Sequence, residues 1–143
     1  MTKTNSLGIL IAAFAALMPF TASADAVADF YKGKKIQLMI GFGAGEAYDV
    51  YARELARVMP KYLPGHPLFV PQNMPGAGSV TAANAIYNVA PRDGTAFGTA
   101  HRFVPLMPLL GIEGTKFDPL KFTYIGSMNR ENTVCIAWKG SGI

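Results

Sequence analysis

The sequence has little of what metal and redox chemistry needs. It contains one cysteine, Cys135, and two histidines, His66 and His101. One thiol cannot form a disulfide framework within the chain, and a lone cysteine is more typical of a small buried hydrophobe than of a nucleophile. The two histidines show no metal-ligand spacing to another His, Cys or Glu. We therefore expect neither a metal nor a cofactor.

Runs of like charge are also absent. The chain of 143 residues has 13 Lys and Arg against 9 Asp and Glu. Its positive charges are scattered and are not gathered with interleaved aromatic residues in one segment, so binding to nucleic acid is not expected. A weak attraction for small anionic solutes is compatible with this mild excess of positive charge.

The apolar run near the N-terminus is too short to cross a bilayer as a helix. It covers residues 7–20, whereas a spanning helix needs about 20 apolar residues. Lys3 precedes this run, and Ala22-Ser23-Ala24 follows it with small residues at the spacing that signal peptidase prefers. We interpret residues 1–24 as a cleavable signal peptide, which predicts export to the periplasm.

Hydrophobic periodicity predicts alternating strands and helices in the mature chain. An amphipathic helix is expected from Tyr48 to a break near Pro60, and a second helix is expected after Ser79, which we expect to be its N-cap. Short apolar runs predict strands at residues 36–40, 68–70 and 95–99. This order is typical of an α/β fold with a parallel sheet and right-handed crossovers.

The last third of the chain is less regular. Residues 103–110 predict a short helix interrupted by Pro105 and Pro108. Two further strands are predicted at residues 122–128 and 133–138. The glycine-rich end that follows is more typical of a cut than of a finished domain.

Glycines follow two of the predicted strands. Gly41, Gly43 and Gly45 come after the first strand, and Gly76 and Gly78 come after the second. In a parallel α/β sheet, ligands collect at the carboxyl ends of the strands, where helix N-termini offer free backbone N–H groups to anions. The two segments therefore predict a site for one small anionic group.

Nucleotide binding and catalysis have weaker support. The stretch Gly41-Phe42-Gly43-Ala44-Gly45-Glu46 begins like a dinucleotide fingerprint, but Glu46 stands where the third glycine is needed. No segment matches a P-loop. Ser79 lies in Gly-Ala-Gly-Ser, which is not the Gly-x-Ser-x-Gly turn of hydrolases. For His101 we favour a loop histidine hydrogen-bonded at a strand end over ligand contact.

Four segments together resemble a known family. These are KKIQLMIGFGAGEAYDVYAR, VPQNMPGAGSVTAANAIYN, APRDGTAFGTAHR and FDPLKFTYIGSM. In this order and spacing they are similar to the solute-binding receptors of tripartite tricarboxylate transporters, the Bug-type receptors. The ordered set is specific, above all Asn73 to Gly78 followed by Asp93-Gly94-Thr95.

The resemblance implies an α/β, periplasmic-binding-protein-like fold of type II with two lobes. The first lobe would be largely present at residues 25–126. Residues 127–143 would form a crossover strand and the start of a second lobe that is mostly missing. It further implies a monomer that binds a small organic acid, a di- or tricarboxylate or a related solute, and delivers it to the membrane permease subunits of the transporter.

The resemblance also implies which residues bind the solute. In the family, backbone amides of the loops after the first and third strands hold a carboxylate of the ligand. Carried over to this chain, and with the glycine turn after the second strand, the candidate residues are Phe42, Gly43, Ala44, Gly45, Glu46, Tyr48, Asp49, Gly76, Ala77, Gly78, Thr99, Ala100 and His101.

Two acidic residues in this set need separate interpretation. For Asp49, at the head of the first helix, we favour a capping or loop-fixing role over ligand contact, because its charge opposes a carboxylate. Glu46-Ala47 replaces the paired glycines that the family commonly shows. Either Glu46 points to solvent, which we favour, or the preferred solute is neutral, zwitterionic or an amine-bearing acid.

The leading hypothesis is thus a fragment of a periplasmic solute receptor without enzymatic activity. Two alternatives remain open at this point. One is a nucleotide-binding α/β enzyme domain, and the other is an inert remnant.

Overall fold

The computed structural model describes residues 22–130, 138 and 140. Along this part of the chain, helices and strands alternate as the periodicity predicts. The elements in order are α2 (Ala22–Tyr31), β1 (Lys35–Ile40), α3 (Ala47–Val58), η1 (Met59–Tyr62), β2 (Leu68–Asn73), η2 (Ala77–Ser79), α4 (Val80–Asn88), β3 (Ala96–Thr99), η3 (Val104–Leu106) and η4 (Pro119–Lys121), the η elements being 3₁₀ turns.

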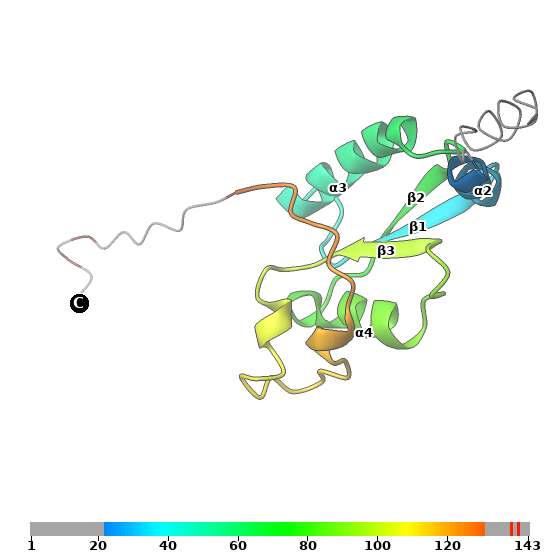
Figure 1. Cartoon of the computed structure of the whole chain (residues 1–143). Helices are drawn as coiled ribbons and strands as arrows, with labels where there is room; N and C mark the ends of the chain where they lie inside the picture. Colours follow the sequence, from blue (N-terminus) through cyan, green and yellow to red (C-terminus); the bar gives the residue numbers. More distant parts are fainter. Residues whose placement is uncertain (1–21, 131–137, 139, 141–143) are drawn as a thin grey trace, which may run out of the picture.

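The described strands form one parallel sheet in the order β2-β1-β3 (Figure 1). Lys35 is in register with Leu68, and Gln37 is in register with Ala96. β1 lies in the middle because its sequence, KIQLMI, supplies apolar side chains to both faces, and Leu38 and Ile40 are fully buried. The three predicted strands are confirmed, and the parallel sheet with them.

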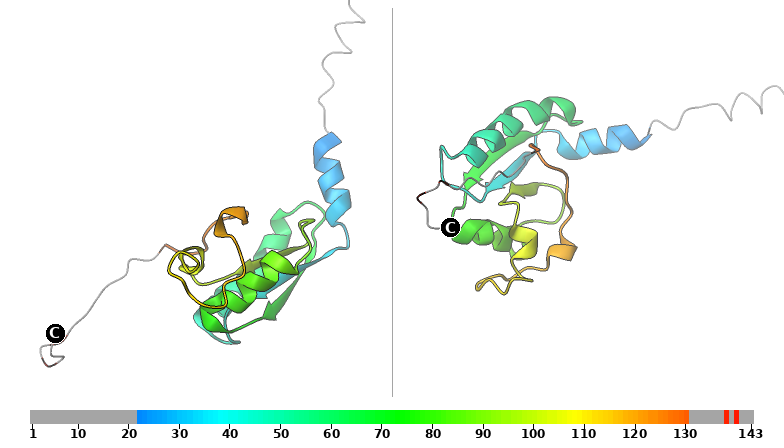
Figure 2. Two further views of the ribbon diagram at one scale, coloured as in Figure 1. Left: turned by 90° about the horizontal axis from the view of Figure 1, so that it is seen from below. Right: turned by 90° about the vertical axis from the view of Figure 1, so that its left-hand side faces the viewer.

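Helices cover both faces of the sheet, with α3 on one side and α4 on the other (Figure 2). Leu38 and Ile40 pack with Ala52 of α3, and Phe42, Ala56 and Phe97 surround this cluster. On the opposite face, Val80 and Ala83 of α4 pack with side chains from the segment after β3, Val104 and Phe117. Two small apolar clusters therefore hold the layers together.

Helix ends follow the prolines and glycines. α3 ends at Val58, and the 3₁₀ turn η1 carries Pro60, so the predicted break is confirmed. Gly65 has a φ of 79° and lies against α2, where an added Cβ would collide with the carbonyl oxygen of Ala28. This close approach explains a glycine in the connection to β2.

The segment after β3 differs from its prediction. Within residues 103–110 only η3 is helical, and isolated turns follow, such as the Leu110 N–H bond to the Leu106 carbonyl oxygen. Pro105 and Pro108 lack the N–H groups that a continuous helix would need. The predicted helix is therefore confirmed only as a short 3₁₀ turn.

The strand predicted at residues 122–128 is wrong. This segment forms no ladder with the described strands, and Tyr124 and Ile125 are largely exposed. An apolar, β-prone run becomes a strand only when it finds an edge to pair with. Phe122 instead packs against Tyr87 with their ring centroids 5.6 Å apart. The strand predicted at residues 133–138 and Cys135 lie outside the described residues, apart from Trp138.

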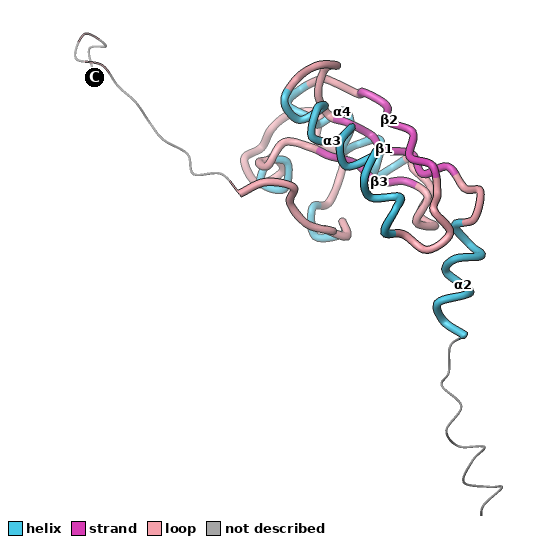
Figure 3. The backbone as a smooth tube through the Cα atoms, turned by 90° about the horizontal axis from the view of Figure 1, so that it is seen from above, coloured by secondary structure: helices cyan, strands magenta, loops and turns pink. Residues whose placement is uncertain are grey.

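Helix α2 projects from the sheet at the amino end of β1, as Figure 3 shows. Its last residue, Tyr31, donates a hydrogen bond from its hydroxyl to the carbonyl oxygen of Gly94, over 3.3 Å. The predicted signal-peptide boundary after Ala24 falls inside this helix, and residues 1–21 lie outside the described part. Within the described residues, no helix is both long and apolar enough to span a membrane.

Candidate functional site

The carboxyl ends of the three strands meet at one edge of the sheet, as the two glycine segments predict. The Gly41 amide, just after β1, donates to the Thr99 carbonyl oxygen at the end of β3 over 2.9 Å. On the other side of β1, the Met74 amide donates to the Ile40 carbonyl oxygen over 2.7 Å. The loops after β1, β2 and β3 therefore start side by side.

Ser79 joins the loops after β1 and β3. The β1–β3 ladder would continue with a bond from the His101 N–H to the Gly41 carbonyl oxygen. Instead, the Ser79 hydroxyl lies between them: it accepts from the His101 N–H over 3.1 Å and donates to the Gly41 oxygen over 3.0 Å. Ser79 is the N-cap residue of α4, as predicted, but its side chain makes no cap bond and forms this bridge instead.

The backbone before α4 runs through a left-handed turn. The φ angle is positive at four successive residues, Gly76 (138°), Ala77 (45°), Gly78 (61°) and Ser79 (78°). An L-residue in this region costs roughly 1–2 kcal/mol, which glycine avoids. Ala77 and Ser79 both bear this cost, and the turn brings the Ser79 hydroxyl, 1% exposed, to its two partners. The candidates Gly76, Ala77 and Gly78 are themselves exposed.

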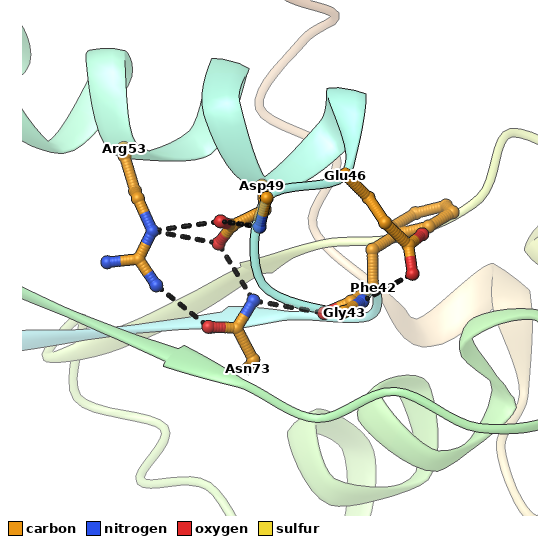
Figure 4. A network of polar contacts seen from close by, with 7 residues as sticks. Phe42, Gly43, Glu46, Asp49, Arg53 and Asn73 are labelled. Atoms are coloured by element: carbon orange, nitrogen blue, oxygen red, sulfur yellow. Dashed lines mark hydrogen bonds and ion pairs between the residues drawn. The ribbon is translucent and has the colours of Figure 1, made fainter.

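Asp49 is the centre of a network that fixes the loop after β1 (Figure 4). Its carboxylate accepts from the Gly45 N–H over 2.8 Å, from Arg53 Nε over 3.0 Å and from Asn73 Nδ2 over 2.8 Å. Asp49 as a whole residue is 2% exposed. The hydrogen bond from Arg53, with those from Gly45 and Asn73, lowers the pKa of Asp49 from 3.8 to about 2. The loop-fixing role favoured for Asp49 agrees with this geometry.

Asn73 extends the network to a second point of the same loop. Its Nδ2 also donates to the Phe42 carbonyl oxygen over 3.0 Å, and its Oδ1 accepts from the Arg53 guanidinium over 2.8 Å. The loop is thus held at Phe42 and at Gly45 by side chains from β2 and α3. A loop held at two points keeps its remaining amides in one orientation, which is what preorganised binding requires.

Glu46 stands at the N-cap position of α3 and turns back onto the loop. It is exposed, as the favoured prediction has it, but its Oε1 accepts from the Gly43 N–H over 3.1 Å. An added Cβ on Gly43 would lie 2.6 Å from this oxygen. The carboxylate of Glu46 therefore lies inside the proposed anion site rather than away from it.

Several backbone amides that the sequence suggests as anion donors already have partners. Gly43, Gly45 and His101 donate to Glu46, Asp49 and Ser79. The expectation of freely offered amides is therefore wrong for these three. Among the described residues, the amides of this region without a hydrogen-bond partner include those of Phe42, Ala44 and Ala100. They also include the amides of the first turn of α3, Ala47, Tyr48 and Asp49.

Aromatic side chains surround this region. The rings of Phe42 and Tyr48 stack with centroids 4.0 Å apart and an angle of 6° between their planes. The His101 ring lies 6.3 Å from each of them and 5.3 Å from the ring of Phe103. His101 Nδ1 accepts from the Phe103 N–H over 3.3 Å, which agrees with the loop role that we favoured for this histidine.

Thr99 adds an unsatisfied group to the same edge. Its Oγ1 is buried and has no hydrogen-bond partner among the described residues. Because side chains alternate along a strand, Thr99 lies on the same face of β3 as Phe97, which packs toward α3. A buried hydroxyl without a partner is costly, so Thr99 is an unfavourable feature of this edge.

Sequence reasoning missed Arg53 and Asn73 as site residues and did not predict the bridge that the Ser79 side chain makes. Arg53 follows Asp49 by four residues, which places the two on one face of a helix and is a readable signal. Asn73 ends β2 and belongs to the motif that carries the family resemblance. The bridge made by Ser79 depends on a left-handed turn, for which the sequence offers only its glycines.

No group of three or more His, Cys, Asp and Glu side chains within the described part of the chain is arranged to hold a metal ion. Backbone amides, carboxylates and aromatic rings lie at this edge of the sheet.

The comparisons with known proteins give one match. No family model matches the sequence, and no solved structure matches the chain. A protein of Cupriavidus necator described as "UPF0065 protein in gbd 5'region" is 37% identical over 112 residues, which cover 78% of this chain and 33% of that protein. The chain thus spans about a third of the length of this relative. Over most of its described length the chain is thus similar to one part of a UPF0065 protein.

Proposed function

We propose that this chain forms part of a Bug-type solute-binding receptor, and that the carboxyl edge of its sheet is one wall of a site for a small carboxylate. The observation that carries the proposal is the convergence of the loops after β1, β2 and β3 at this edge, with the loop after β1 fixed by Asp49 and Asn73. The similarity to a UPF0065 protein supports it.

Binding would use groups that have no other partner. The amides of Ala47 and Tyr48 open a helix of 12 residues, whose dipole favours an anion at this end. The rings of Phe42 and Tyr48 would exclude water from one side of the solute. No covalent bond to the solute is part of this mechanism, and the receptor would not be an enzyme.

The two-lobed fold is part of the same proposal. A second lobe that closes over this edge would desolvate the solute and strengthen each hydrogen bond to it. Since the chain spans about a third of its relative, we expect the residues described here to bind solutes weakly, with the permease subunits of a transporter as the partner of the complete receptor.

A titration followed by NMR tests the proposal, because chemical shifts report weak binding residue by residue. We expect succinate or citrate, added to the ¹⁵N-labelled chain, to shift the amide signals of Ala44, Ala47 and Tyr48. Control signals are those of Gly33 and Gly65, at the opposite end of the strands. Absence of any shift at the loop after β1 would refute the proposal, and shifts caused by NAD⁺ at the same amides would favour the nucleotide-binding alternative.

Export to the periplasm is tested separately. We expect the chain expressed with its own N-terminus to appear in the periplasmic fraction, with cleavage after Ala24. Mass spectrometry of the intact protein reads the new N-terminus directly. A full-length chain that stays in the cytoplasmic fraction would contradict this part of the proposal.

A further inference from the structure

The carboxylate of Glu46 already occupies one amide of the proposed site. Its Oε1 accepts from the Gly43 N–H over 3.1 Å, and the side chain is exposed. A solute carboxylate that approached Gly43 would have to displace this group. The Gly43 N–H is therefore already bonded to the Glu46 carboxylate. A solute that approaches this amide comes close to the negative charge of Glu46.

The charge on Glu46 is not balanced by a neighbouring cation. The other acid of this loop, Asp49, is neutralised by Arg53 at 3.0 Å. Glu46 has no ion pair within the part of the chain that the structure describes, and its one hydrogen bond comes from a neutral amide. The head of α3 thus carries a net negative charge that a pure dicarboxylate would have to approach against repulsion.

The two aromatic rings close to Glu46 in the sequence also favour a positive charge on the ligand. Phe42 precedes Gly43, and Tyr48 lies two residues after Glu46 and stacks on Phe42. Aromatic faces attract ammonium groups, by about 0.5–1 kcal/mol at exposed sites. A carboxylate and two aromatic rings together are a combination that recognises a protonated amine.

We propose that the solute carries a protonated amine beside its carboxylate, and that Glu46 is the residue that selects it. The inference rests on the proposed function and deepens it. The ammonium group pairs with the Glu46 carboxylate, and the solute carboxylate takes the free amides of Ala47 and Tyr48. A solute with the same carbon skeleton but no amine lacks this pairing and is repelled by Glu46.

A matched pair of solutes tests the inference. Succinate and aspartate differ by one amino group on the same skeleton, and we would titrate each into the ¹⁵N-labelled chain and into three variants. Glu46→Gln keeps a side-chain oxygen for the Gly43 N–H and removes the charge, and Glu46→Ser places another good N-cap at the same position. Glu54→Gln removes an exposed charge from α3 outside the site, where Glu54 pairs with Arg57.

We expect the unmodified chain to bind aspartate up to about fivefold more tightly than succinate, as for the gain of one exposed ion pair. This order is the reverse of what a mildly basic protein would show by net charge alone, because succinate carries the larger negative charge. In Glu46→Gln and Glu46→Ser the preference is lost, while Glu54→Gln retains it.

Two results overturn the inference and leave the proposed function standing: succinate binds as well as aspartate to the unmodified chain, or the preference persists in both Glu46 variants. If neither solute shifts the amides of the loop after β1 in any variant, the proposed function fails and the inference fails with it.

Discussion

The hydroxyl of Ser79 donates a hydrogen bond to the carbonyl oxygen of Gly41 over 3.0 Å, although the two residues are 38 positions apart in the chain. The Ser79 Oγ also accepts a hydrogen bond from the His101 N–H. The Ser79 side chain thus takes the place of one backbone hydrogen bond between β1 and β3. It joins the turn before α4 to the loops that follow these two strands. The geometry of the candidate site depends on this oxygen atom.

We expect Ser79→Ala to destabilise the protein by about 1–3 kcal/mol, because it leaves the Gly41 oxygen and the His101 N–H buried without a partner. The left-handed φ of 78° is unfavourable for both residue types, so the difference reports the hydroxyl. Urea unfolding followed by circular dichroism measures it. Ser127→Ala is the control, since the Ser127 hydroxyl is exposed and, among the described residues, bonds only to Asn129. Equal unfolding midpoints for the two variants would contradict the bridge.

We expect the stabilising effect of Asp49 to depend on pH below about 4. Arg53, Gly45 and Asn73 lower the pKa of Asp49 from 3.8 to about 2. A carboxyl group with a lowered pKa in the folded state stabilises it above the pKa of the unfolded state and loses this effect as the pH falls through the folded value. The stability advantage of the unmodified chain over Asp49→Asn should therefore be full at pH 6 and should shrink between about pH 4 and pH 2. Thermal unfolding of both chains across this range measures it, and a constant difference would refute the assignment.

We expect Asn73→Asp to release the loop after β1. The substitution removes the Nδ2 donor to Phe42 and places a second carboxylate where Asn73 now donates to Asp49 over 2.8 Å. Hydrogen exchange of the Gly45 amide, which bonds to Asp49, should become faster. Gln72→Glu adds the same charge at the preceding residue, which is exposed, and should leave that amide protected. Unchanged protection of Gly45 in Asn73→Asp would show that the network does not hold the loop.

Two arginines of α3 allow a comparison between a buried and an exposed partner. Arg53 pairs with Asp49, whose side chain is 3% exposed, whereas Arg57 pairs with Glu54, which is 60% exposed. We expect Arg53→Ala to lower the unfolding midpoint clearly, because a buried carboxylate loses its cation. Arg57→Ala should leave the midpoint nearly unchanged, as is usual for exposed pairs. Differential scanning fluorimetry of the two variants measures this contrast, and equal shifts would contradict it.

Local patterns in the sequence predict the sheet and its two main helices. The apolar run of β1, the helical spacing of Ala52 and Ala56, and the proline at position 60 each act within one element, so the sequence alone shows them. The strand predicted at residues 122–128 fails because a strand also needs a partner edge, and no local pattern in that segment shows whether one is there.

The site is predicted in part, for the same physical reason. The glycine segments indicate the correct edge of the sheet, and the charge of Asp49 indicates a role in holding the loop. The sequence does not show that the carboxylates of Glu46 and Asp49 accept hydrogen bonds from the Gly43 and Gly45 N–H groups. Hydrogen bonds within a loop depend on the path of its backbone. The bridge by Ser79 is equally non-local, since its partners come from other elements.

β1 is the first strand of the chain and the middle strand of the sheet. Its two neighbours, β2 and β3, follow it in the sequence, and Leu68 and Ala96 are their first residues in register with it. During synthesis from the N-terminus, the apolar strand β1 therefore leaves the ribosome before β2 and β3, which flank it in the sheet, have been made. Residues 35–40 are the stretch that a holding chaperone would meet uncovered during synthesis.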